Sequence, residues 1–167
     1  MTEELKPIGK DITGYELLAK AIKALLNQFP GLNGQKILFE ELGEDAGIAF
    51  STDAGALVMA ERRSITDHVT QSCQFPFLVV YRTSSTREFQ KLNVSAFLDT
   101  LGKWLCKEPV EINGESYRLL SYPAISDGRE ITRITRNNSY GTVPNENKSQ
   151  DWILPVSVQY TYEFDIW

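Results

Sequence analysis

Residues 156–166 read VSVQYTYEFDI, and this stretch decides the fold class of the chain. Every second residue is apolar, and serine, glutamine, threonine, glutamate and aspartate stand between the apolar positions. Side chains of a β-strand point alternately to the two faces of a sheet, so a period of two predicts a strand with one buried and one solvent-facing side. We therefore expect this segment to be an integral strand of the sheet.

Two other segments carry apolar residues at helical spacing and are predicted to be amphipathic helices that pack on this sheet. The first begins at residues 13–16, TGYE, which have the form of a capping box, and ends at Pro30 and Gly31. The second begins at residues 85–88, STRE, a second capping-box sequence, and stops before Pro109.

The segments between the helices have the lengths and turn residues of strands. Residues 36–41, 46–51 and 56–61 are predicted to be short strands joined by tight turns. A longer extended region covers residues 66–83, in which FLVVY at 77–81 is apolar on both faces. We expect its first half to reach beyond the core and its second half to lie at the sheet centre. Pro76 cannot donate to a ladder, which predicts a bulge or an exposed edge there.

The last third of the chain continues this pattern of strands and turns. Asn113 and Gly114 predict a hairpin that joins residues 110–112 to 116–120. Residues 129–136, REITRITR, are predicted to be an exposed or edge strand whose charges discourage unwanted pairing. Polar turn formers fill residues 137–151, and loops of this length within a compact domain are usually functional or disordered.

Together these elements predict an α+β fold, because the strands are grouped rather than each followed by a helix. We expect a single domain over residues 1–167, with a mixed, mainly antiparallel sheet packed by two amphipathic helices and with extended hairpins.

Composition limits the functional classes. The chain has 17 basic and 22 acidic residues and a formal net charge of −5, which argues against sequence-specific nucleic-acid binding. No apolar run is long enough for a membrane span and the first residues, MTEELKP, do not resemble a signal peptide, so we expect no membrane association and a cytoplasmic protein. Cys73 and Cys106 predict neither a disulfide framework nor a metal cluster, and we interpret both as small core or half-core residues.

Candidate catalytic groups are few. His68 is the single histidine, and Asp67 beside it would point to the other strand face, so we interpret His68 as a surface or interface residue. The acidic residues at 40, 41, 44 and 45 lack the ligand pattern of a calcium loop and are interpreted as a solvated turn. Phosphate-binding glycine loops and nucleophile elbows are absent from the sequence. We expect no catalytic residue, no cofactor and no metal ion.

The arginines of residues 129–136 are candidates for contact with an acidic partner. Residues four apart on a strand share a face, so Arg129 and Arg133 are predicted to align, with Arg136 pointing away. A solvated edge is the alternative interpretation.

Nearly the whole chain resembles a family of small proteins from the morphogenesis modules of tailed phages and prophages of Gram-positive bacteria, known as minor capsid or tail terminator proteins. The segments that carry the resemblance are DITGYE, LLNQFPGL, ILFEEL, DAGIAF, SITDHVTQSCQFPFLVVYR, FLDTLGKWLC and DGREITRITRNNSYG.

The resemblance implies a structural, ring-forming protein that caps a finished tail tube and contributes to head–tail joining. Its partners would be copies of itself in a ring of about six subunits, the tail tube protein and the head–tail connector proteins. It would be located in the cytoplasm of the bacterial host during assembly and then in the tail or neck of the virion. We predict that the polar face of residues 156–166, or the loop before it, faces a neighbouring subunit or the tail lumen. The candidate interface residues are Arg129, Arg133, Tyr140, Glu163 and Asp165.

Some members of the family carry the label of a chloramphenicol resistance protein. The acetyltransferase of that name has a catalytic histidine in an H-x-x-x-D-G motif, whereas His68 begins the sequence HVTQSC. Without that motif the label does not transfer, and we expect no enzymatic activity. The alternative hypothesis is a small cytoplasmic enzyme or ligand-binding domain of unknown substrate, in which His68 or the arginines line a pocket.

Overall fold

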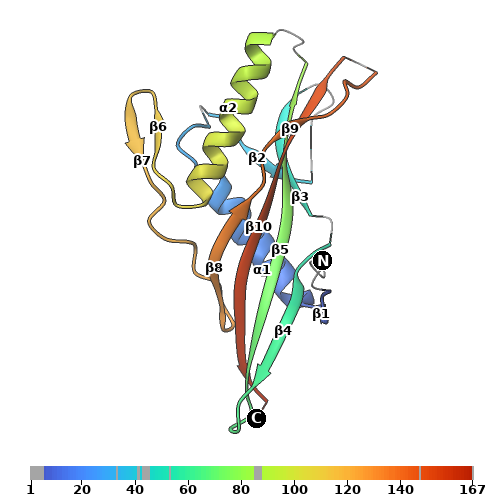
Figure 1. The fold of residues 1–167 in the computed structure, drawn as a ribbon, viewed down its shortest axis with the longest axis vertical. Helices are drawn as coiled ribbons and strands as arrows, with labels where there is room; N and C mark the ends of the chain where they lie inside the picture. Colours follow the sequence, from blue (N-terminus) through green and yellow to red (C-terminus); the bar gives the residue numbers. More distant parts are fainter. Residues whose placement is uncertain are drawn as a thin grey trace, which may run out of the picture.

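Two long antiparallel strands, β5 (His68–Thr83) and β10 (Gln150–Asp165), form the centre of the sheet and pair along their whole length (Figure 1). The computed structural model describes residues 6–32, 34–40, 42, 46–52, 54–84, 88–146 and 148–166, with the side chains of 88–92 left aside. The remaining elements are β1 (Gly9–Lys10), α1 (Ile12–Leu26), β2 (Ile37–Phe39), β3 (Gly47–Thr52), β4 (Leu57–Arg63), α2 (Glu88–Leu105), β6 (Val110–Ile112), β7 (Glu115–Tyr117), β8 (Arg129–Arg136) and β9 (Tyr140–Gly141).

On the side away from the other central strand, each central strand pairs with two different strands, one after the other along its length. The second half of β5 pairs with β3 and its first half pairs with β4, while β10 pairs first with β9 and then with β8. Pro76 lies where β3 gives way to β4, and Pro155 lies where β9 gives way to β8. A proline lacks the N–H of a ladder, so it is tolerated at these interruptions. The exposed edge predicted at Pro76 is therefore confirmed.

Both helices pack on one face of the sheet, which we call the inner face. The α1 residue Tyr15 contacts Phe75, the α2 residue Phe97 contacts Tyr81, and a side chain at Gly102 of α2 would meet Leu154. The register of β5 and β10 places these three sheet residues on the same face. The core comprises, among others, Leu18, Ile22, Leu25, Leu26, Phe50, Phe75, Phe77, Val79, Leu98, Leu101, Leu105, Leu154, Val156, Val158 and Tyr160.

The described residues thus form one α+β domain with a mainly antiparallel sheet, which confirms the predicted fold class. The strand predicted at 156–166 is confirmed and begins earlier, at Gln150. The hairpin at Asn113 and Gly114 is also confirmed, because both residues have the positive φ angles that a tight type I′ turn requires.

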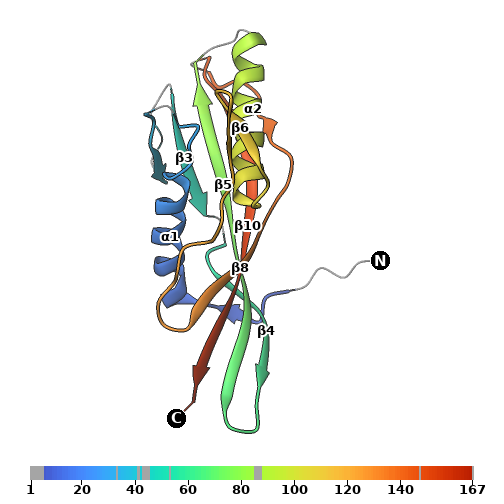
Figure 2. The same cartoon turned by 90° about the vertical axis from the view of Figure 1, so that its left-hand side faces the viewer.

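Below the helices, the sheet continues as a projection that we call the arm, formed by residues 60–72 and 161–165 (Figures 1 and 2). The prediction that the first half of β5 reaches beyond the core is therefore confirmed. Its second half lies at the sheet centre, as predicted, but only its inner side is fully buried. On the opposite side, the outer face, Leu78 and Val80 are half-buried because both helices lie on the inner face.

The three strands predicted at 36–41, 46–51 and 56–61 are confirmed as β2, β3 and β4. Strands β2 and β3 are parallel neighbours, and β3 and β4 both pair with β5.

Two local predictions were wrong. The first helix does not start at a capping box of residues 13–16, because Asp11 is the N-cap and its carboxylate accepts from the backbone of Gly14. Residues 137–151 are not one irregular loop, since β9 and the start of β10 lie within them. The second capping box, at 85–88, falls largely outside the described residues.

No helix in the described part of the chain combines the length and the apolar character needed to span a bilayer.

Candidate interaction surfaces

Arg129, a predicted interface residue, is buried instead of exposed. Strand β8 is an edge strand as predicted, but its pairing with β10 shifts between Gln159, opposite Arg133, and Tyr160, opposite Ile131. Thr132 is thus an extra, bulged residue, and a bulge reverses which face the following residues occupy. Arg129 therefore points to the inner face, and the prediction that it shares a face with Arg133 was wrong.

The buried guanidinium of Arg129 joins a polar network at the start of α1. Its Nε and terminal nitrogen donate to the two carboxylate oxygens of Asp11 over 2.9 and 2.8 Å, and Tyr160 donates its hydroxyl to the same carboxylate over 2.8 Å. The centre of the Tyr162 ring lies 3.8 Å from the guanidinium carbon. Only 2% of the Arg129 side chain and 6% of the Asp11 side chain are exposed, so the two charges compensate each other out of contact with water.

This network fixes the ionisation of Asp11. Burial raises the pKa of the Asp11 carboxyl, but the hydrogen bonds from Arg129, Tyr160 and Gly14 and the positive charge of Arg129 outweigh it, so the pKa lies below the usual value. Hydrogen bonding to Asp11 holds the pKa of Arg129 above its usual value. Asp11 and Tyr160 were not among the predicted site residues; the one available signal for Asp11 was an acidic residue immediately before the helical pattern.

We expect this carboxylate to make the fold sensitive to acid. A carboxyl group whose pKa is lowered by folding stabilises the protein above its unfolded pKa, about 3.9, and loses that contribution as the pH falls through the folded value. The difference in unfolding free energy between the wild type and Asp11→Asn, measured by urea titration, should be constant above about pH 5 and shrink below about pH 4. A difference that stays constant down to pH 2 would contradict this assignment.

The other two arginines of β8 occupy different faces. Arg133 is exposed on the outer face, as an interface residue must be. Arg136 points to the inner face, where its side chain passes over Gly102 of α2 and its guanidinium lies 3.9 Å from Glu108. Of the three arginines of β8, Arg133 is therefore the one that lies on the outer face.

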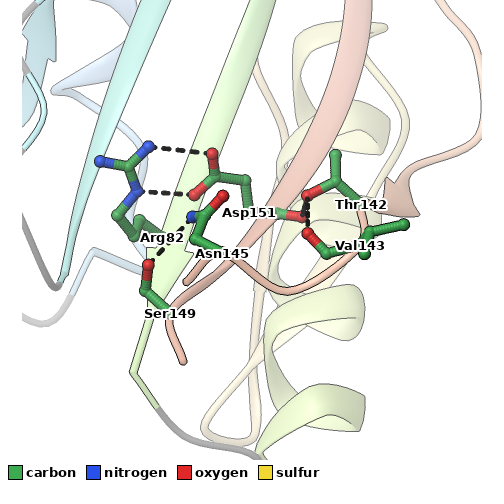
Figure 3. A network of polar contacts seen from close by, with 6 residues as sticks. All are labelled: Arg82, Thr142, Val143, Asn145, Ser149 and Asp151. Atoms are coloured by element: carbon green, nitrogen blue, oxygen red, sulfur yellow. Dashed lines mark hydrogen bonds and ion pairs between the residues drawn. The ribbon is translucent and has the colours of Figure 1, made fainter. Parts of the chain in front are cut away.

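Tyr140 lies at the opposite end of the molecule from the arm, on β9, and is 49% exposed. Hydrogen bonds order the segment that follows it (Figure 3). Arg82 of β5 holds Asp151 of β10 through two hydrogen bonds of 2.6 and 3.0 Å, and the backbone carbonyl of Asp151 accepts from Thr142. The side chain of Asn145 donates to Ser149 over 3.0 Å. Tyr140 is thus exposed next to a segment whose described residues are linked by hydrogen bonds.

The acidic candidates Glu163 and Asp165 surround the single histidine on the outer face of the arm. The Nδ1 atom of His68 lies 2.8 Å from Asp165, and its Nε2 atom lies 4.0 Å from Glu163. Asp67 instead binds Arg63, so it does not orient the histidine, as predicted. Side chains of the arm remain accessible here, with 40% of His68 exposed.

Neither cysteine has the surroundings of a reactive thiol. Burial is the main cause that raises the pKa of Cys73 to about 11, and burial also raises the pKa of Cys106. Both therefore stay protonated and poorly nucleophilic near neutral pH. Among the described residues, no group of histidine, cysteine, aspartate and glutamate side chains has the arrangement of a metal site.

Among the hollows of the described residues, one lies on the outer face and another at the β8 edge. A shallow groove of about 290 Å³ lies over the two prolines, where Ala54, Pro76, Leu78 and Pro155 give it a mainly apolar lining. A cleft of about 580 Å³, the edge cleft, lies between residues 121–125 and the start of β8, and it includes Glu130 and Glu163.

Tyr122 lines the edge cleft beside the end of α2. Its hydroxyl donates to the carbonyl of Leu105 at the end of α2 over 2.8 Å. The Lys107 ammonium lies 4.4 Å from the centre of the Tyr122 ring. These contacts hold the wall of the cleft against the helix.

The five predicted interface residues therefore do not form one site. Arg129 is buried, Arg133 lies on the outer face of the edge strand β8, Tyr140 lies at one end, and Glu163 and Asp165 lie on the arm. No protein-family model matches this chain, and no curated protein matches it at a significant level of similarity.

Proposed function

We propose that this protein is a structural component of phage morphogenesis, a ring-forming tail terminator that caps the tail tube and contributes to head–tail joining. The observation that carries the proposal is the arm, which projects beyond both helices and keeps a polar outer face accessible (Figure 2). The side chains of Glu163 and Asp165 are 55% and 68% exposed on it. The sequence resemblance to tail terminator proteins is the reason for proposing the phage tail as the assembly.

The geometry supports contacts between neighbouring copies. In the described part of the chain both helices pack on the inner face, so no described helix covers the outer face of β10. A sheet that carries helices on one face only, and that projects beyond them, offers neighbours an accessible face and two strand edges. A heterologous contact that closes on itself generates a ring. The partners under this proposal are further copies of the chain, the tail tube protein and the connector proteins.

The decisive measurement is the oligomeric mass with and without tail tubes. We expect oligomers of about six subunits, and we expect these oligomers to bind the ends of purified tail tubes without consuming any substrate. A protein that stays monomeric at high concentration and does not bind added tail tubes would contradict the proposal. A ligand-dependent rise in melting temperature would instead favour a small-molecule site, because a ligand that binds only the folded state stabilises it.

A further inference from the structure

The sheet of the arm has two edges that differ in charge. Strand β1 covers only Leu57 and Val58 of β4, so residues 60–63 pair only with β5 among the described strands. The start of β8 likewise pairs only with β10. One edge thus belongs to β4 and the other to β8.

On the outer face of the arm, the β4 edge is positively charged. Arg62 is exposed there and makes no ion pair within the described residues, whereas the exposed Glu61 points to the opposite face and accepts a hydrogen bond from Gln71. Its neighbour Arg63 is held by Asp67 over 2.7 Å, in the turn that ends the arm. Arg62 is therefore the positive charge that this edge offers to a partner.

The start of β8 is acidic and contains the edge cleft, whereas the exposed Arg133 lies beyond the bulge at Thr132 and does not line the cleft. Glu130 and Asp127 are exposed there, and Glu163 adds a third carboxylate. The guanidinium of Arg129, which also borders the cleft, is already compensated by Asp11. The cleft is therefore negatively charged where it opens, apart from Lys107 at its inner wall beside Tyr122.

The two edges cannot meet within one chain. The register aligns Arg62 with Thr70, Thr70 with Glu163, and the backbone of Glu163 with Gly128, so Arg62 and Glu163 lie at the same height of the sheet. Glu130 lies opposite Thr161, two residues along β10 from Glu163. Strand β8 is three strand spacings from β4, about 14 Å. Only a second molecule can bring the β4 edge into contact with Glu130.

The charges also select which edges can join. On the outer face, two β4 edges would bring one Arg62 near the other and two β8 edges would bring carboxylates near carboxylates, whereas the unlike edges attract. At the arm the strand order is β4, β5, β10 and β8, with every pair antiparallel, which leaves β4 antiparallel to β8. A copy rotated about an axis along the strands therefore continues the antiparallel order.

We propose that the edge cleft binds Arg62 of a second copy of this chain, so that copies associate head to tail through opposite edges of the arm. The guanidinium of Arg62 pairs with Glu130 and Glu163, since a planar guanidinium forms strong charge-assisted hydrogen bonds with carboxylates. This contact rests on the proposed ring-forming function and assigns the residues that join its subunits.

Charge reversal tests the contact. Arg62→Glu and Glu130→Arg, each alone, are expected to raise the dissociation constant between copies at least about tenfold in sedimentation velocity at 100 mM salt. The double variant Arg62→Glu/Glu130→Arg should recover association, because the swapped charges attract again. An equimolar mixture of the two single variants should also recover it, since each supplies the complement of the other at both edges.

Matched controls separate the contact from net charge. Lys20→Glu on α1 and Glu111→Arg on β6 change the net charge equally at exposed positions away from the arm, and should leave association unchanged. All of these side chains are exposed, so melting temperatures should be unaffected. If both single variants still form oligomers like those of the wild type, this contact is overturned and the ring proposal stands. The same holds if the double variant associates no better than the single variants. A wild type that stays monomeric would overturn both.

Discussion

Arg129→Met is expected to lower the free energy of unfolding by about 3 to 5 kcal/mol, because it leaves the Asp11 carboxylate buried without its cation. The guanidinium makes two hydrogen bonds of 2.8 and 2.9 Å to this carboxylate, and both side chains are nearly inaccessible to water. Methionine retains an apolar stem of similar length, so most of the loss reports the unpaired charge. Urea unfolding followed by circular dichroism at pH 7 measures it.

Arg133→Met is the matched control, since it removes an arginine from the same strand at an exposed position. This change should lower the free energy of unfolding by no more than about 0.5 kcal/mol. Combining Arg129→Met with Asp11→Asn should cost less than the sum of the single changes, because neither charge is then left unpaired. If the free energy of unfolding of Arg129→Met lies within about 1 kcal/mol of the wild-type value, the network does not have the stabilising role that its burial indicates.

Gly128→Ala is expected to destabilise the entry into β8 by more than the ordinary cost of a left-handed residue. Gly128 has a φ of 77°, and a Cβ at this position would collide with the backbone carbonyl oxygen of Glu163. A left-handed conformation costs an alanine roughly 1 to 2 kcal/mol, and the collision adds to this because two backbones must separate. We expect a total of about 3 kcal/mol or more from thermal and urea unfolding.

The control for this prediction is Gly114→Ala. Gly114 has a similar φ of 80°, but a Cβ there would meet nothing within 4 Å. It should therefore show only the conformational cost, about 1 to 2 kcal/mol. Equal losses for the two variants would show that the backbone at Gly128 yields without strain.

The fold class was predictable because it depends on periodicity along the chain. The alternation at residues 156–166 identified β10, and the apolar stripes identified α1 and α2. The exposed edge at Pro76 was also predictable, because a residue without an N–H is tolerated where the hydrogen-bond ladder is interrupted, whatever its neighbours are. These properties follow from single residues and their immediate spacing.

The candidate surfaces were harder to predict because a bulge has no reliable signature in the sequence. One extra residue, Thr132, moved Arg129 from the predicted outer side to the interior and separated it from Arg133. The capping residue was missed for a related reason. Asp11 is selected as the N-cap jointly by Gly14 and by Arg129, which lies 118 positions away.

The sequence alone determined that this chain forms an α+β domain with a long final strand that has one apolar and one polar side. Only the tertiary structure decided that both helices share the inner face, that β4 and β8 become opposite edges with opposite charges, and that Asp11, Arg129 and Tyr160 meet in the interior. The physical reason is the range of the interactions. Side-chain periodicity is local and appears in any short window, whereas strand order and register join residues up to 97 positions apart, the contacts of Asp11 with Arg129 and Tyr160 join residues more than 100 positions apart, and all of them depend on how the whole sheet packs.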